Sequence, residues 1–145
     1  HFLIFPDGSS ERLHGHNYQV ETNIEGHLHQ SGIVYDFLAI KPLLKQICDE
    51  LDEHVLLPGR HPKLKIEQQE EQIYVTYQHK HYMFPAQEVL ILPIDNSSAE
   101  RFASYILDRL EQEINNIFPM AHIANIKVIV HESPGQYGYY WKSFS

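Results

Sequence analysis

Apolar and polar side chains alternate along residues 18–25, and this alternation is the clearest pattern in the chain. One set of positions holds Tyr18, Val20, Thr22 and Ile24, and the other holds Gln19, Glu21, Asn23 and Glu25. A period of two indicates a β-strand with one buried face, because successive strand residues point to opposite sides. We predict a strand over residues 14–25, and its first residues include two histidines.

Two later stretches repeat apolar residues at helical spacing. The first follows Asp36, whose carboxylate can cap the free N–H groups of a helix start; its apolar positions are Phe37, Ile40, Leu43, Leu44, Ile47, Cys48 and Leu51. Pro42 fits this helix only if regular helix begins close to it, and otherwise kinks it. The second follows the capping-box pair Ser97 and Glu100 and ends at Phe118–Pro119; its apolar positions are Ala99, Phe102, Ala103, Ile106, Leu107, Leu110 and Ile114.

The remaining apolar runs are short and typical of strands. They are the end of a strand over 1–5, a short strand over 33–35, a hairpin of 73–77 and 82–84 turning at 78–80, and strands over 89–94 and 126–130. This order lacks a repeating strand–helix–strand rhythm, so we predict a single α+β domain over residues 1–145, with an antiparallel sheet and helices on one face. Its open sheet edges would favour closure against further copies of the chain.

Composition and charge exclude several classes of partner. The chain is 43% apolar and 21% charged, which is typical of a globular domain, and its net charge of −8 argues against binding to nucleic acid or to a membrane surface. No apolar run approaches the ~20 residues of a membrane span. Cys48 is the only cysteine, so no disulfide forms within the chain, and we expect a reducing compartment such as the cytoplasm.

The sequence His14-Gly15-His16 is a candidate metal site. Residues two apart on a strand share a face, so both imidazoles can reach one ion. A catalytic zinc needs three protein ligands and one open position, and His1, across a short turn, is the candidate third ligand. The alternative is that the two histidines are incidental surface residues, as most such pairs are.

Six motifs together resemble the 6-pyruvoyl-tetrahydropterin synthase and 6-carboxytetrahydropterin synthase family. They begin at His1, Leu13, Gly32, Leu51, Ser98 and His131, and read HFL, LHGHNY, GIVYDF, LD, SAE and HESP. The resemblance implies a tunnelling fold with a four-stranded antiparallel sheet and two helices on one face. It also implies an oligomeric β-barrel, in a homohexamer made as a dimer of trimers, with active sites between subunits. Residues 58–94 are the part least like the short members, and we interpret them as an inserted hairpin region.

The same resemblance implies a role for each matching residue. His1, His14 and His16 correspond to the zinc ligands. Glu132 corresponds to the carboxylate that anchors the pterin, an acceptor for two parallel N–H bonds. Ser98 and Glu100 correspond to residues that line the pterin pocket, although a plain capping box explains them nearly as well.

The chain departs from the family at two catalytic positions. The usual cysteine base before the His-x-His pair is absent, and Glu11 is the candidate substitute, with a solvated loop charge as the alternative. The usual Leu-Asp-His reads Leu-Asp-Glu-His here, so Asp52 and His54 form a proton-transfer pair only if the segment is extended, because residues two apart on a helix diverge.

We therefore expect a zinc-dependent lyase that acts on 7,8-dihydroneopterin triphosphate, of the 6-pyruvoyl- or 6-carboxy-tetrahydropterin synthase type. Glu11 would be the base, assisted by Asp52 and His54. The alternative is a metal-containing pterin-binding protein without turnover, and a third possibility is a purely structural zinc. The product is left open, because the possible outcomes share one metal and one pocket.

Overall fold

The structure, a computed structural model, describes residues 1–144. Its residues group into two compact units, and each unit is formed by two separate segments of the chain. The first unit comprises His1–Gly15 and Leu51–Ser98, and the second comprises His16–Glu50 and Ala99–Ser145.

The second unit is built on a three-stranded antiparallel sheet. Its strands are β1 (Gln19–Gly26), β7 (Ile123–Ser133) and β8 (Gln136–Ser143), in the order β1-β7-β8. Gln19 pairs with His131, and His131 pairs with Tyr137. Within residues 1–144 this sheet has three strands, which is one fewer than predicted. Strand β8, whose sequence is rich in aromatic residues, was not among the predicted strands.

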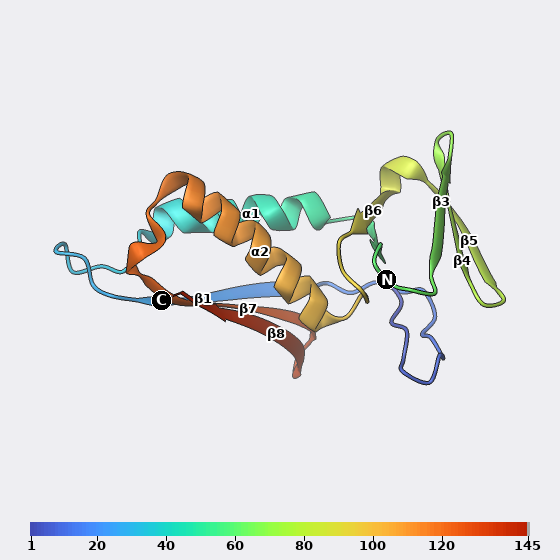
Figure 1. The fold of residues 1–145 in the computed structure, drawn as a ribbon, viewed down its shortest axis with the longest axis horizontal. Coiled ribbons are helices and arrows are strands. Elements are labelled where there is room, and N and C mark those ends of the chain that lie inside the picture. Colours follow the sequence, from blue (N-terminus) through green and yellow to red (C-terminus); the bar gives the residue numbers. More distant parts are fainter. Residues whose placement is uncertain (145) are drawn as a thin grey trace. The chain divides into compact units, whose positions relative to one another are not determined.

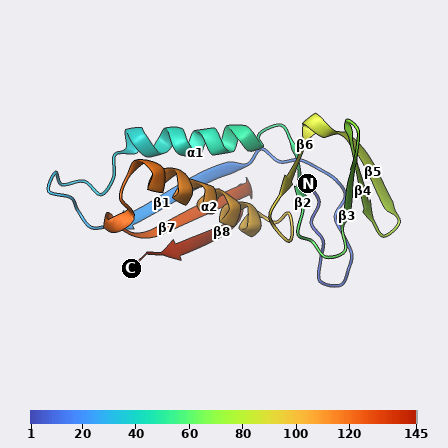
Figure 2. The ribbon, with the colours of Figure 1, turned by 45° about the horizontal axis from the view of Figure 1, so that its top comes forward.

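Two helices, α1 (Phe37–Leu51) and α2 (Ala99–Ile117), lie on the same side of this sheet (Figures 1 and 2). The predicted apolar positions of α2 are all buried: Ala99, Phe102, Ala103, Ile106, Leu107, Leu110 and Ile114. Arg109 on α2 binds the carboxylate of Glu50 on α1 at 2.8 Å. The predicted α+β class, with two helices on one face of an antiparallel sheet, is confirmed.

The two helix starts differ in how well the sequence predicted them. The N–H group of Leu38 donates to Oδ1 of Asp36 at 2.8 Å, so Asp36 caps α1 as predicted. Helix α2 begins at Ala99, and the Ser97 hydroxyl donates instead to the carbonyl oxygen of Phe2 at 2.6 Å. The prediction of Ser97 as the cap is therefore wrong, because its side chain is used to fix the N-terminal segment.

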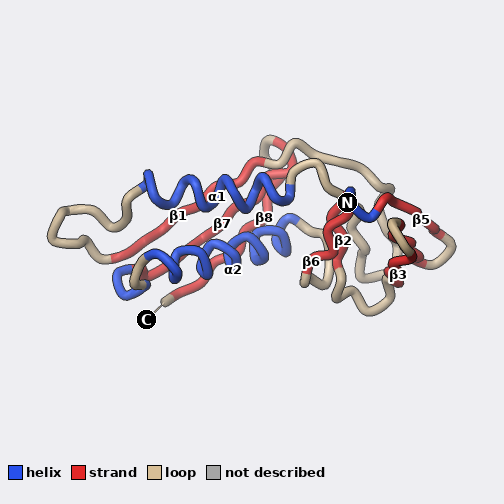
Figure 3. Tube along the Cα trace, turned by 90° about the horizontal axis from the view of Figure 1, so that it is seen from above, coloured by secondary structure: helices blue, strands red, loops and turns tan. Residues whose placement is uncertain are grey.

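The first unit contains strands β2 to β6, and Figure 3 shows strands and loops in separate colours. Strands β2 (Val55–Pro58) and β6 (Val89–Leu92) form a parallel pair, and β3 (Lys65–Gln69), β4 (Gln72–Tyr77) and β5 (Lys80–Pro85) form an antiparallel sheet followed by the short helix η1 (Ala86–Glu88). The predicted hairpin is confirmed as β4 and β5, whereas β2 and β3 were not among the predicted strands. The core of this unit is formed by Phe2, Ile4, Leu57, Ile73, Val75, Tyr77 and Val89.

Three strands predicted within the first 35 residues differ from the structure. Strand β1 starts at Gln19, so residues 14–18 are irregular, and residues 33–35 form no strand. Residues 1–5 make a single antiparallel bridge, from Ile4 to Ser10. The irregular backbone at 14–18 means that ordinary strand geometry does not align His14 with His16.

Neither helix in the described part of the chain is long and apolar enough to cross a bilayer. The assignment of residues 1–145 to one domain, with 58–94 as an inserted region, stays a prediction.

The sheet of the second unit provides a test of which face forms the core. Ile126 is fully buried on β7, whereas Ile129 lies on the opposite face of the same strand and is half-buried. We expect Ile126→Ala to lower the free energy of unfolding by about 2–5 kcal/mol, because it leaves a cavity. Ile129→Ala should cost clearly less. Urea denaturation of both variants measures the difference, and equal losses would contradict the assigned faces.

Candidate metal centre and its surroundings

His1 and His14 are paired through their main chains. The nitrogen of His1 donates to the carbonyl oxygen of His14 at 2.9 Å, and the N–H group of His14 donates to the carbonyl oxygen of His1 at 3.0 Å. Such a reciprocal pair is the repeating unit of an antiparallel ladder, and it brings the two side chains close together. The imidazole centroids are 4.7 Å apart.

Two main-chain carbonyl groups fix the tautomer of these rings. Nδ1 of His1 lies 2.8 Å from the carbonyl oxygen of Ser97, and Nδ1 of His14 lies 2.7 Å from that of Arg12. A carbonyl oxygen only accepts hydrogen bonds, so each Nδ1 carries the proton when the ring is neutral. The lone pair is then on Nε2, the form of histidine that binds a metal, with Nδ1 held as in many metal sites.

His1, His14 and His16 together could hold a metal ion. One ligand atom from each lies within 4.8 Å of the other two. Zinc–nitrogen bonds of about 2.0–2.1 Å place tetrahedral ligand atoms roughly 3.3 Å apart, a difference that side-chain rotations can close. The donor set of three imidazoles suits zinc, and also copper, iron and nickel. This arrangement is consistent with a metal site formed by the three histidines.

The carboxylate of Glu11 lies beside this cluster. Its Oε2 accepts the N–H group of Leu3 at 3.0 Å and lies 3.9 Å from Nε2 of His14. The N–H group of Glu11 in turn donates to the carbonyl oxygen of Leu3 at 2.9 Å. Glu11 is therefore held at both its backbone and its side chain, and the half-exposed carboxylate is not a freely solvated loop charge.

Glu132 occupies an irregular position near the end of β7. The register of β7 against β8 shifts between His131 and Ser133, so Glu132 lies at a bulge, a feature that redirects side chains. Its Oε2 is 3.8 Å from Nε2 of His16. Pro134 and Gly135 then close the hairpin, and Gly135 has the positive φ of 79° that a tight turn requires.

Ser98 and Glu100 flank the first residue of α2. Glu100 lines a surface hollow of about 360 Å³, together with residues Tyr137–Trp141 of β8. The close approach of helix and strand depends on Gly138, because a Cβ atom there would lie 2.6 Å from the nitrogen of Glu100. Glu100 therefore faces a hollow, while the pocket role predicted for Ser98 stays a prediction.

Asp52 and His54 lie in a turn that is neither extended nor helical. Glu53 between them has a positive φ of 56°, and Nδ1 of His54 lies 2.7 Å from the main-chain oxygen of Asp52. The carboxylate of Asp52 accepts the N–H group of Glu53 at 3.0 Å. The imidazole is thus oriented by a main-chain carbonyl, where a carboxylate had been expected.

Ser97 supports the cluster, a role that its position in the sequence did not indicate. It is fully buried; its carbonyl oxygen binds His1 and its hydroxyl binds the carbonyl oxygen of Phe2. The sequence held no separate signal for this role, because a serine just before a helix is most simply interpreted as a cap.

Comparison with known proteins places the chain in a family. The family model for 6-pyruvoyl tetrahydropterin synthase matches residues 1–143. The chain belongs to this family of pterin synthase lyases. A protein of Methanocaldococcus jannaschii, provisionally named 6-carboxy-5,6,7,8-tetrahydropterin synthase, is 32% identical over 97% of this chain and 86% of its own length. A protein of Pyrococcus horikoshii with the same provisional name is 28% identical over 94% of this chain and 80% of its own length.

Solved members of the 6-pyruvoyl tetrahydropterin synthase family share the fold. The enzyme of Plasmodium vivax matches with a TM-score of 0.91 and 32% identity, covering 99% of this chain and 88% of its own. The enzyme of Plasmodium falciparum matches with the same TM-score and coverage at 34% identity. Two further structures of the Plasmodium vivax enzyme are of catalytic-residue mutants, in which a glutamate is replaced by alanine or by cysteine.

The contact between α2 and β8 provides a test of how the hollow is built. We expect Gly138→Ala to lower the free energy of unfolding by about 1–3 kcal/mol, because the added methyl group overlaps the backbone of Glu100. Gly15→Ala is the matched control, because nothing lies within 4 Å of a Cβ atom at that position. Thermal and urea unfolding measure both variants; a Gly138→Ala protein as stable as the control would contradict the close approach.

Proposed function

We propose that this protein is a zinc-dependent lyase acting on 7,8-dihydroneopterin triphosphate, as a 6-pyruvoyl- or 6-carboxy-tetrahydropterin synthase. The observation that supports it most is the position of Glu11, whose carboxylate lies 3.9 Å from a ring nitrogen of the histidine cluster. This position suits a base that serves a metal-held substrate. The catalytic glutamate of the Plasmodium vivax relative supports the same assignment.

His1, His14 and His16 would hold the zinc ion through their Nε2 atoms. Bound there, zinc would polarise the substrate side chain and make its protons easier to remove. The protein contributes the orientation and tautomer of two ligands, because the carbonyl oxygens of Ser97 and Arg12 accept from Nδ1 of His1 and His14 and leave Nε2 to face the ion. The triphosphate of the proposed substrate is inferred from the resemblance to the family. The names of the relatives mention only a tetrahydropterin.

Glu11 would take a proton from a carbon atom of the substrate side chain, after which triphosphate leaves. Its bond from the Leu3 N–H group fixes one oxygen and leaves the carboxylate able to accept a proton. The neighbouring serines are poor alternatives, because a hydroxyl does not ionise near neutral pH. Their hydroxyls are also engaged, with Ser9 bound to Asp7 and Ser10 bound to Lys80.

His54 would assist the proton transfers. With its Nδ1 proton donated to the carbonyl oxygen of Asp52, its Nε2 can accept and release a proton. In this proposal Asp52 orients the imidazole through its main chain, and its carboxylate stabilises the turn through the Glu53 N–H group. The pair is retained in a different form from the one that the family motif implies.

Glu132 would anchor the pterin, and Ser98 and Glu100 would line the pocket. A carboxylate can accept two parallel N–H bonds from the pterin ring and its amino group.

The open edges β1 and β8 support assembly into a homohexameric barrel, in which another subunit would complete the pocket. Tyr137 and Trp141 on β8, each 56% exposed, would be covered in such an assembly. We place the enzyme in the cytoplasm.

The proposal predicts a specific reaction and a specific loss. With zinc and 7,8-dihydroneopterin triphosphate, the protein should release triphosphate and form a pterin product, whose mass distinguishes a pyruvoyl, a carboxy or a cleaved side chain. Glu11→Gln should lower kcat by about 10²–10⁴, because the amide cannot act as a base. It should leave the zinc content and pterin affinity unchanged.

The control is Glu67→Gln on β3, an exposed carboxylate paired with Lys65, and it should keep full activity. If the wild-type protein binds zinc and pterin but releases no triphosphate, the protein is a binding protein without turnover. If Glu11→Gln is fully active, another group is the base.

A separate prediction concerns Glu132. Glu132→Gln should weaken pterin binding about 10- to 100-fold, because it removes charge-assisted hydrogen bonds worth about 1.5–3 kcal/mol. Zinc stoichiometry should stay at that of the wild type. Calorimetry with a pterin and metal analysis of the same sample measure the two quantities; unchanged affinity would show that Glu132 is not the anchor and would favour a purely structural zinc.

A further inference from the structure

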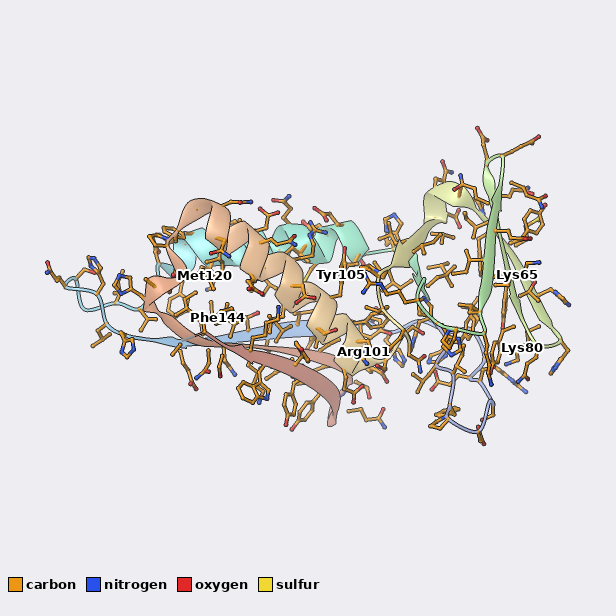
Figure 4. All side chains as sticks on the ribbon, viewed as in Figure 1. Lys65, Lys80, Arg101, Tyr105, Met120 and Phe144 are labelled. Atoms are coloured by element: carbon orange, nitrogen blue, oxygen red, sulfur yellow. The ribbon has the colours of Figure 1, made fainter. Side chains whose placement is uncertain are left out.

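Lys80, labelled in Figure 4, is the first residue of β5, and it binds the segment that contains Glu11. Its ammonium nitrogen lies 2.6 Å from the hydroxyl of Ser10, 3.3 Å from the carbonyl oxygen of Ser10 and 3.1 Å from the carbonyl oxygen of Glu11. An ammonium group has three protons to donate. All three of its hydrogen bonds are therefore made to two consecutive residues, and one of these is the proposed base.

The turn between β4 and β5 holds the same segment at a second point. The hydroxyl of Tyr77 donates to the carbonyl oxygen of Gly8 at 2.7 Å, and the amide of Gln78 donates to the same oxygen at 3.0 Å. The ring of Tyr77 is only 2% exposed and belongs to the core of this unit. The turn is thus anchored by packing, and it holds the segment by hydrogen bonds to its main chain.

Residues 3–11, which we call the connector, are also closed on themselves. The N–H group of Phe5 donates to the carbonyl oxygen of Ser9 at 2.8 Å, and Ile4 forms a bridge with Ser10. Leu3 and Glu11 make the two bonds already described at the other end. The backbone of Glu11 is consequently held from one side by Leu3 and from the other by Lys80.

We propose that Lys80 is a positioning residue for Glu11, and that the β4–β5 hairpin serves as the scaffold of the base. The proposal rests on the function proposed above. A displacement of about 1 Å at a reacting group can cost a factor of 10² in rate, so a connector held only by its own bonds would present the carboxylate less accurately. Lys80 touches neither substrate nor metal in this role and acts through the carbonyl oxygen of Glu11.

The test compares two lysines of the same sheet. Lys80→Met keeps the length of the side chain and removes the three hydrogen bonds; we expect kcat to fall about 10- to 100-fold with KM and zinc content unchanged. Lys65→Met on β3 is the matched control, because Lys65 is exposed and its ammonium nitrogen lies 3.3 Å from the carboxylate of Glu67, on the same strand. Its kcat should equal that of the wild type. A Lys80→Met enzyme with wild-type kcat would overturn the proposal.

A second measurement reports on the connector without using activity. Arg12 is exposed and directly follows Glu11, so trypsin cleavage after Arg12, followed by mass spectrometry, measures how firmly the connector is held. We expect cleavage to be several times faster in Lys80→Met than in Lys65→Met. Equal rates would count against the proposal. If Lys80→Met does not fold, Ser10→Ala, which removes the shortest of the three bonds, should show a smaller change in the same direction.

A double-mutant cycle decides whether Lys80 acts through Glu11. Residues that act as a unit have non-additive effects on kcat. In a Glu11→Gln background, Lys80→Met should therefore cause little further loss, whereas independent effects would multiply and overturn the proposal. A wild-type protein that releases no triphosphate would instead contradict the proposed function, and the cleavage measurement would still test the hold of Lys80 on the connector.

Discussion

The reciprocal main-chain pairing of His1 with His14 is the contact on which the candidate site depends. It joins the two ends of residues 1–14, which form an N-terminal hairpin, and brings two imidazoles together. It also sets the register in which Leu3 meets Glu11, so the pairing that brings two candidate metal ligands together also places the carboxylate beside them. A slip of one residue would turn one of these side chains to the opposite face.

Main-chain carbonyl groups orient three histidine side chains of the first unit. Those of Ser97, Arg12 and Asp52 each receive Nδ1 of a histidine. A carbonyl group cannot ionise, so it fixes the tautomer of a ring without adding a negative charge next to it. The carboxylates of Glu11 and Glu132 lie at ion-pair distance from Nε2 of His14 and of His16 respectively. Orientation and negative charge are thus supplied by different groups.

The sequence predicted the features that follow from periodicity and failed where a contact distant along the chain decides. Helix α2, the β4–β5 hairpin and the cap by Asp36 are visible in local patterns, and the family motifs identified the histidine triad. The bond from Ser97 to Phe2 joins residues 95 positions apart, and no local pattern indicates it. Likewise, no local pattern distinguishes Lys80 from an ordinary lysine in a hairpin. The left-handed backbone of Glu53 could not be predicted either, because this conformation is uncommon for a residue with a Cβ atom.

The bonds from the β4–β5 hairpin to the connector end mostly on carbonyl oxygens, at Gly8, Ser10 and Glu11. Such bonds depend on the path of the backbone and little on the identity of the side chains that follow it. Exchange of the side chains of Phe5, Pro6 and Ser9 should therefore have little effect on the position of Glu11. Inserting or deleting one residue there would shift every carbonyl out of reach, so length, more than composition, should be the inherited property of this loop.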